Sequence, residues 1–254
     1  MRNEIYLDNS ATTPVAEEVV QAMEPYWTIQ FGNPSSPHLR GVAAENTLNS
    51  SRKQLGNLLQ VNPSNLYFTA SGTEANNLAL QGVANTPYFL RHPGHIITTP
   101  IEHPSVLRVV DHLSEIGWSV SYLDVDSFGQ IDPQSLRTHL KPDTKIVSVM
   151  LVNNELGTIA PIRELGTIIE MENRERQHPI VFHVDCVQAL GHLSFRIPEL
   201  KAHLCSFSGH KVFGPKGIGL LWADRQAKLR PMMFGGDQEG GLRPGTENIP
   251  GIVG

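Results

Sequence analysis

One short polar segment of the chain could bind a phosphate group. Ser71-Gly72-Thr73 stands at the start of an expected helix, where free backbone N–H groups and the positive end of the helix attract anions. The same residues also suit an ordinary helix N-cap, with Ser71 or Thr73 capping and Glu74 in the first turn. Taken alone, the segment is compatible with both interpretations.

Lys211 has surroundings that suit a nucleophilic amine. It follows Ser208 and His210 and precedes a glycine-rich stretch. A lysine held among small residues near another cationic group can lose its proton and form a Schiff base with a carbonyl compound. A solvent-exposed lysine without a chemical role is the usual alternative. The largely apolar run before it (LCSFS, 204–208) points into the protein and argues against that alternative.

Asp185 is a carboxylate at the end of an apolar run. Residues 180–184 (IVFHV) read as a buried strand, which places Asp185 at the edge of a sheet. A carboxylate there can stabilise a protonated pyridine nitrogen, which lets pyridoxal phosphate act as an electron sink. The alternative is a cap for the turn toward Gln188.

Other chemistries have weaker support in the sequence. His103 offers a ring plane and a proton, but it is one of 11 histidines. The histidine pairs lack cysteine or carboxylate partners at metal-ligand spacing, so we expect no metal site. We find no phosphate-binding P-loop, GxGxxG fingerprint or GxSxG elbow. A phosphate site, a nucleophilic lysine and a carboxylate together predict a pyridoxal-phosphate enzyme.

The elements that must position these residues alternate between helix and strand, as in α/β proteins with parallel sheets. The expected helices are 15–26, 42–59, 73–83, 105–116, 133–140 and 162–176. The expected strands are 66–69, 95–98, 119–123, 145–151, 180–184, 203–206 and 217–222. Five strands run into polar clusters, and ligands of open α/β sheets bind at the carboxyl ends of strands.

Composition narrows the class of protein. The chain has 254 residues, 40% hydrophobic and 18% charged, which suits a sizeable core. A net charge of −5 gives no basic field, so we expect no nucleic-acid partner. No apolar run approaches membrane-spanning length, so we expect no membrane association. Two cysteines fit a reducing compartment, and the predicted location is the cytoplasm, with an organelle such as the mitochondrion as an alternative.

Read in order, the polar segments resemble the class V aminotransferases, specifically the cysteine desulfurases and selenocysteine lyases. The matching segments are 6–14 (YLDNSATTP), 31–36 (FGNPSS), 68–77 (FTASGTEANN), 102–103 (EH), 153–157 (NNELG), 183–185 (HVD), 208–211 (SGHK) and 243–248 (RPGTEN). The resemblance covers essentially the whole chain. It implies the large domain of a fold-type-I pyridoxal-phosphate enzyme, with a mixed, mostly parallel seven-stranded sheet.

The resemblance also implies residue roles. Lys211 corresponds to the lysine that forms the internal aldimine, and Lys211 or His103 would move protons. His103 would stack on the cofactor ring and Asp185 would pair with its nitrogen. The remaining expected cofactor contacts are Gly72, Thr73, Asn154, Gln188, Ser208, His210 and Thr246. Thr246 would reach the phosphate of a neighbouring subunit, which implies a homodimer.

The expected domain organisation includes the cofactor-binding domain of the family but not its small domain. Residues 1–14 would border the active site and 15–254 would form the cofactor-binding domain. The small domain, with its sulfur-accepting cysteine loop and substrate-clamping arginine, would be absent from this chain. Cys186 follows Asp185 and could substitute as a nucleophile, but successive residues on a strand face opposite ways, which favours a buried thiol. Cys205, inside an expected strand, is predicted to be a core residue too.

Several functions therefore compete. The leading one is removal of sulfur or selenium from L-cysteine or L-selenocysteine to give L-alanine, with a sulfur-acceptor or scaffold protein as a further partner. Residues 33–37, 231–236 and 172–177 resemble selenocysteine lyases more closely, whereas 245–250 (GTENIP) is shared with nitrogen-fixation-type desulfurases. The alternatives are a catalytically incomplete cofactor-binding form and a transaminase or other lyase on the same scaffold.

Overall fold

A mixed β-sheet forms the centre of the molecule. The structure is a computed structural model that describes residues 5–254, so residues 1–4 of the expected N-terminal segment lie outside the described residues. The strands are β1 (Leu66–Thr69), β2 (His95–Thr98), β3 (Ser119–Tyr122), β4 (Thr144–Met150), β5 (Val181–Asp185), β6 (Leu204–Ser208) and β7 (Gly219–Ala223). Their order is β1-β7-β6-β5-β4-β2-β3, and β7 runs antiparallel to both of its neighbours while the other pairs are parallel. The expected mixed, mostly parallel seven-stranded sheet is confirmed.

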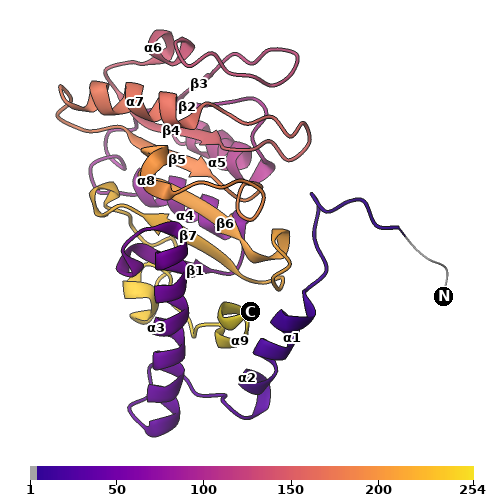
Figure 1. The fold of residues 1–254 in the computed structure, drawn as a ribbon. Helices are drawn as coiled ribbons and strands as arrows, with labels where there is room; N and C mark the ends of the chain where they lie inside the picture. Colours follow the sequence, from indigo (N-terminus) through magenta and orange to yellow (C-terminus); the bar gives the residue numbers. More distant parts are fainter. Residues whose placement is uncertain (1–4) are drawn as a thin grey trace.

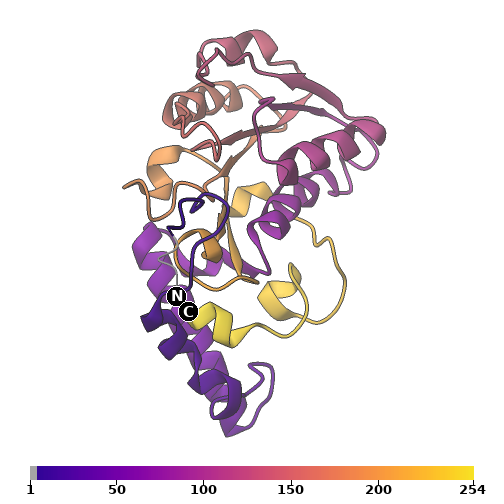
Figure 2. The same ribbon diagram turned by 90° about the vertical axis from the view of Figure 1, so that its right-hand side faces the viewer.

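Helices cover both faces of this sheet (Figures 1 and 2). One face packs against α4 (Gly72–Ala84) and α5 (Pro104–Glu115), and the other against α7 (Ile162–Asn173) and α8 (Ile197–Leu200). The core is accordingly split into two apolar clusters. In β5, Val181 belongs to the cluster on the α4 face, whereas Phe182 and Val184 belong to the other. Strand alternation therefore places Asp185 on the α4 face.

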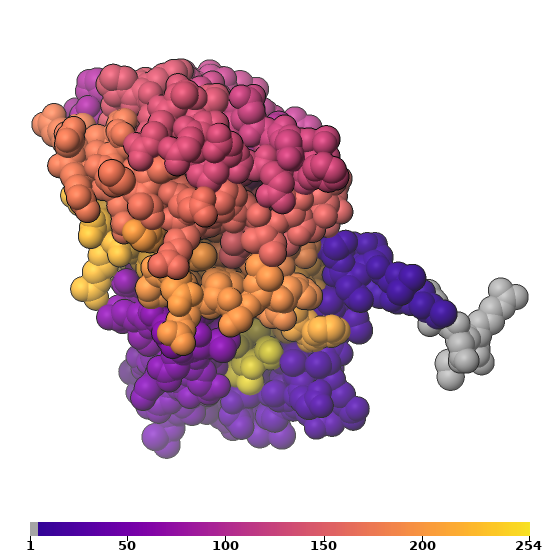
Figure 3. Space-filling model, turned by 45° about the horizontal axis from the view of Figure 1, so that its top comes forward, coloured from indigo at the N-terminus to yellow at the C-terminus, as the bar shows by residue number. Residues whose placement is uncertain are grey.

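A second group of helices extends from one side of the sheet (Figure 1). It contains α1 (Glu17–Met23), α2 (Pro25–Thr28), the long α3 (Leu39–Leu59) and α9 (Ile249–Val253), and α9 contacts the other three. Figure 3 shows the start of the described chain, in indigo, projecting from one side of the molecule, and Ile5 and Leu7 are exposed. None of the helices in residues 5–254 is both long and apolar enough to cross a membrane.

Most differences from the expected elements lie at their boundaries. The expected helix 15–26 is two helices, because Pro25 cannot continue α1 and instead starts α2. The expected helix 42–59 begins earlier, at Leu39, because the ring of His38 caps it by accepting from the N–H of Gly41. The helix expected at 133–140 is only α6 (Ser135–His139). The short helix α8 was not expected.

Candidate active site

A cavity of about 540 Å³ lies at the carboxyl ends of the strands, on the α4 side of the sheet. It is lined by nine of the residues that the sequence singles out: Gly72, Thr73, His103, Asn154, Asp185, Gln188, Ser208, His210 and Lys211. They come from five segments of the chain, because the loops after β1, β2, β4, β5 and β6 meet at this edge. The sheet topology therefore gathers the dispersed motifs into one site.

The N-terminus of α4 provides anion-binding groups at one end of the cavity. Ser71 caps the helix by accepting from the N–H of Glu74, and the first intrahelical bond runs from the N–H of Ala75. The N–H groups of Gly72 and Thr73 precede that bond and so have no acceptor within the helix. Ser71 is therefore an N-cap, as one of the two interpretations expects, while phosphate binding by the free amides stays a prediction.

Ser208 and Gly72 shape the same end of the cavity. Ser208 is 3% exposed, and its hydroxyl oxygen has no hydrogen-bond partner within residues 5–254. A Cβ atom on Gly72 would lie 2.9 Å from Val187 Cγ2 and 3.2 Å from Ser208 Cβ. Only a glycine lets the helix start approach the strand end this closely. A buried hydroxyl without a partner is uncommon in proteins and marks a place where a bound group can supply one.

Asp185 is fixed by hydrogen bonds to both of its oxygens. Its Oδ1 accepts from the N–H of Val187 at 2.9 Å, and its Oδ2 accepts from Asn76 Nδ2 at 2.7 Å. Burial raises the pKa of this carboxyl, while those two bonds and the nearby His103 and Lys211 act to lower it. The carboxylate is therefore positioned before any ligand arrives, and a cation next to it would relieve the cost of its burial.

His103 caps the helix that follows it. Its Nδ1 accepts from the N–H of Ser105 at 3.1 Å and lies 2.7 Å from the hydroxyl of the same serine. Pro104 occupies the first position of α5, which suits a residue with no N–H to satisfy. The ring lines the cavity while its Nδ1 is engaged with the helix.

Lys211 lies across the cavity in the short 3-10 helix after β6. Partial burial lowers its pKa, and the carboxylates of Asp8 and Asp185 oppose that shift. Its amine donates to the carbonyl oxygens of Ser10 and of Ala11, the latter at 2.8 Å. A lysine with a lowered pKa has more of the neutral, nucleophilic amine at neutral pH.

The N-terminal segment packs against the Lys211 loop. The buried Thr13 donates from both its N–H and its hydroxyl to the carbonyl oxygen of His210, each at 3.0 Å. His210 Nδ1 also lies 3.1 Å from the hydroxyl of Thr12. Gln188 Nε2 donates to the carbonyl oxygen of Ser10 at 2.8 Å. The described part of the expected segment 1–14 thus borders this cavity.

Thr246 is the predicted site residue that the cavity does not include. It is exposed, in a segment held to the domain by two ion pairs. Arg52 pairs with the buried Glu239 at 2.7 Å, and Arg243 pairs with Glu74 at 2.8 Å. Thr246 thus lies on an anchored segment and does not line this chain's own cavity.

The sequence analysis missed three buried polar residues beside the cavity: Asn76, Glu102 and Ser105. Glu102 Oε1 accepts from the hydroxyl of Thr99 and from the N–H of Met150, each at 2.9 Å. Burial raises the pKa of Glu102 to about 8. Asn76 and Glu102 fall inside matched motifs (TEANN and EH), which is the signal that could have identified them.

Both cysteines are buried. Cys186 is 0% exposed and lies in the apolar cluster on the face opposite Asp185, as strand alternation predicts. Cys205 is also 0% exposed and belongs to the same cluster. Burial and the neighbouring Cys205 raise the pKa of the Cys186 thiol, which keeps it protonated and unreactive.

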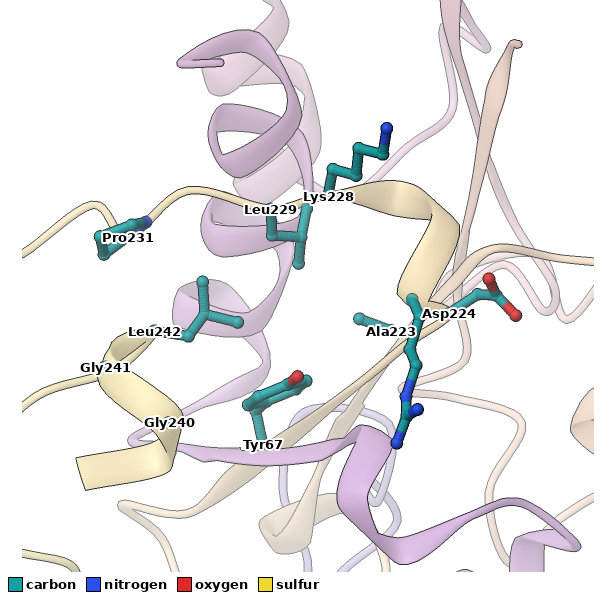
Figure 4. Close-up of a pocket in the computed structure, with 10 residues that line it drawn as sticks. Tyr67, Ala223, Asp224, Lys228, Leu229, Pro231, Gly240, Gly241 and Leu242 are labelled. Atoms are coloured by element: carbon teal, nitrogen blue, oxygen red, sulfur yellow. The ribbon is translucent and has the colours of Figure 1, made fainter. Parts of the chain in front are cut away.

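A different cavity, of about 300 Å³, lies beside β1 and β7 (Figure 4). Tyr67, Leu229 and Leu242 gather around it, whereas the charged ends of Asp224 and Lys228 point away from them (Figure 4). The described residues that line it include none of the predicted site residues. Within residues 5–254 there is also no group of three or more side chains suited to hold a metal ion.

Comparisons with known proteins identify the family of this chain. The class V aminotransferase family model matches residues 5–254. The cysteine desulfurase IscS of Methanosarcina thermophila is 45% identical over 251 residues, which are 98% of this chain and 60% of that protein. The cysteine desulfurase IscS of Dictyoglomus turgidum is 41% identical, and the match covers 100% of this chain and 62% of that protein. The chain thus spans about 60% of the length of these relatives.

Solved structures share the fold. A NifS-like protein superposes with a TM-score of 0.93 at 40% identity, covering 98% of this chain and 67% of that one. SspA, solved in complex with cysteine, also gives a TM-score of 0.93, at 38% identity, covering 98% of this chain and 70% of that one. The expected fold type and family resemblance are confirmed. The chain belongs to the class V aminotransferase family.

Proposed function

We propose that this chain is the cofactor-binding part of a pyridoxal-phosphate-dependent cysteine desulfurase. The observation that carries the proposal is the single cavity into which Lys211, Asp185 and the start of α4 all project. An amine, a carboxylate and a phosphate site are the three groups that pyridoxal phosphate requires. The similarity to proteins named cysteine desulfurases supports the choice of reaction.

The residues present fit this cofactor. The unpartnered hydroxyl of Ser208 and the free amides of Gly72 and Thr73 suit its phosphate group. The carboxylate of Asp185 would hold its protonated ring nitrogen, and the ring of His103 would lie against its face. Asn154, Gln188 and His210 would supply further polar contacts.

Lys211 and Asp185 would have different roles in the proposed reaction. When bound, pyridoxal phosphate supplies an electron sink that weakens the bond between the substrate's β-carbon and sulfur. Lys211 would hold the cofactor, and its free amine would be placed to take a proton from the substrate's α-carbon. Asp185 keeps a negative charge next to the ring nitrogen throughout. Burial of this edge of the sheet strengthens that charge interaction.

Thr246 leads us to include a homodimer in the proposal. It lies outside this chain's cavity on a segment anchored by Arg52–Glu239 and Arg243–Glu74. A second copy of the chain would then receive Thr246 as a phosphate contact. Gel filtration with light scattering tests this, and a strictly monomeric, cofactor-loaded protein would contradict it.

A second candidate function is cofactor binding without desulfurase turnover. It is favoured by the burial of both cysteines, because neither Cys186 nor Cys205 presents an accessible thiol to receive sulfur. L-selenocysteine is a further candidate substrate, for which selenide release would be measured in parallel.

The deciding experiment assays the loaded protein with L-cysteine and dithiothreitol, which can reduce a persulfide to sulfide. The proposal expects alanine and sulfide in equal amounts, and none from Lys211→Ala. Cofactor binding without either product supports the second candidate. Pyruvate and ammonia, or a transamination product, would instead indicate another lyase or a transaminase.

A further inference from the structure

We infer that Asn76 and Ser105 are positioning residues that join Asp185 to His103 and determine which ring nitrogen of His103 carries the proton. The catalytic significance of this inference rests on the proposed function, whereas the hydrogen bonds behind it are all within this chain. The four side chains form a continuous line of hydrogen bonds of 2.7, 2.8 and 2.7 Å. They come from β5, α4 and the start of α5.

Asn76 holds the middle of this line. It is 1% exposed, and its amide nitrogen donates one hydrogen to Asp185 Oδ2 and the other to the hydroxyl oxygen of Ser105. Both of its neighbours therefore act as acceptors toward it. A carboxylate at position 76 could not make these two bonds, and it would place a second negative charge against Asp185.

The direction of the remaining bonds follows from Asn76. Because the hydroxyl oxygen of Ser105 accepts from Asn76, its own hydrogen is available for His103 Nδ1, 2.7 Å away. The backbone N–H of Ser105 donates to the same Nδ1 at 3.1 Å. A nitrogen that accepts twice carries no proton, so the neutral ring has its proton on Nε2.

This tautomer limits what His103 can do in the cavity. With Nδ1 committed to the helix cap and to Ser105, the neutral ring presents an N–H donor at Nε2. It can take up a proton only at Nδ1, where doing so would displace both bonds from Ser105. His103 would therefore cover the cofactor ring and donate a hydrogen bond from Nε2–H. Proton transfer at the substrate carbon would be carried out by Lys211.

The test is a long-range ¹H–¹⁵N NMR spectrum of the ¹⁵N-histidine-labelled chain at pH 8, without cofactor. The signal of His103 is assigned by its disappearance in His103→Gln. We expect chemical shifts of a neutral ring protonated at Nε2. A ring protonated at Nδ1, or a mixture of the two tautomers, would overturn the inference from the wild-type spectrum alone.

Two variants, with a third as a control, then test the role of the hydrogen-bonded line itself. Ser105→Ala leaves the backbone N–H of residue 105 as the one remaining donor to Nδ1, so the ¹⁵N shift of Nδ1 should move from its wild-type value. Asn76→Asp should also move it, and Ser105→Thr, which keeps the hydroxyl, should retain the wild-type shift. An unchanged His103 spectrum in Ser105→Ala would contradict the positioning role. Because none of these spectra requires cofactor or turnover, failure of the proposed desulfurase reaction would leave this result standing, and the reverse also holds.

Discussion

Buried polar side chains occupy two regions of the sheet, and they are satisfied to different degrees. In the interior, His183 Nδ1 and Nε2 lie 2.8 and 2.9 Å from the hydroxyls of Ser148 and Ser206. His95 is held in the same way between the hydroxyls of Thr144 and Ser121. Each ring bridges its strand to both neighbours, and burial lowers the pKa of His183 to about 3 and of His95 to about 4.

At the carboxyl edge, by contrast, buried polar atoms are left without partners. Ser208 Oγ, Asn76 Oδ1 and Glu102 Oε2 make no hydrogen bond with any residue of the described chain. Each such atom costs stability, of order 1–3 kcal/mol. Asp185 and His183 are two residues apart on one strand and share a face, yet only Asp185 borders the cavity. In these two regions, the satisfied histidines connect neighbouring strands, whereas the three unsatisfied atoms lie in or beside the candidate site.

The largest effect expected from this contrast is on stability in the interior. His183→Ala removes both ring bonds and leaves the hydroxyls of Ser148 and Ser206 unpaired in a cavity. We expect a loss of about 3 kcal/mol in the free energy of unfolding at pH 7, measured by chemical denaturation. Binding of pyridoxal phosphate per folded molecule should change little. A loss of cofactor binding with unchanged stability would reverse the assignment of the two regions.

The pH dependence of the unfolding free energy of His183→Ala tests whether the wild-type ring is buried in its neutral form. The folded-state pKa of His183 is lowered from 6.5 to about 3, so its contribution is present above pH 6.5 and is lost as the pH falls through 3. The difference in stability between wild type and His183→Ala should therefore narrow between pH 6.5 and pH 3. A constant difference would mean that the ring is not buried neutral.

The next largest effect is on activity at the edge. Asp185→Asn keeps the shape of the side chain but removes the charge beside the cofactor nitrogen. We expect turnover to fall about 100-fold, equivalent to ~2.7 kcal/mol, while the free energy of unfolding changes by less than about 1 kcal/mol. Steady-state kinetics and denaturation of the same preparations decide this. A variant that loses stability but not turnover would place Asp185 with the structural histidines.

A smaller effect is expected from Glu102, which is buried but incompletely satisfied. Its folded-state pKa is raised from 4.5 to about 8, so its stabilising contribution is present below pH 4.5 and is lost as the pH rises through 8. Glu102→Gln does not titrate, so its stability relative to wild type should rise over that window. The trend is opposite in sign to that of His183→Ala. Denaturation at pH 5, 7 and 9 would reveal it, and parallel curves would contradict it.

The sequence predicts the strands well, because buried strands are largely apolar runs that can be recognised locally. Asp185 and Lys211 were singled out because each follows such a run. His183 and His95 lie inside strands, and their local sequence does not indicate that hydroxyl groups on the neighbouring strands flank them. Long-range pairing, which only the sheet register supplies, decides their role.

The hydrogen-bond partners of the site residues could not be predicted either, because they also depend on long-range packing. Asn76 reads as a polar residue in a helix, and its bonds to Asp185 and Ser105 depend on how α4, α5 and β5 meet. Helix ends were misplaced where a side chain decides them, as at His38, or where proline divides a helical pattern, as at Pro25.

The central claim is that the carboxyl-edge cavity binds pyridoxal phosphate through Lys211. The most direct test incubates the protein with pyridoxal phosphate, reduces it with borohydride and locates the added mass by peptide mass spectrometry. Lys145 is the matched internal control, because burial lowers its pKa too but it lies near the opposite end of β4. The account predicts one equivalent on Lys211 and none in Lys211→Ala. Labelling of Lys145, or equal labelling of the Lys211→Ala variant, would contradict it.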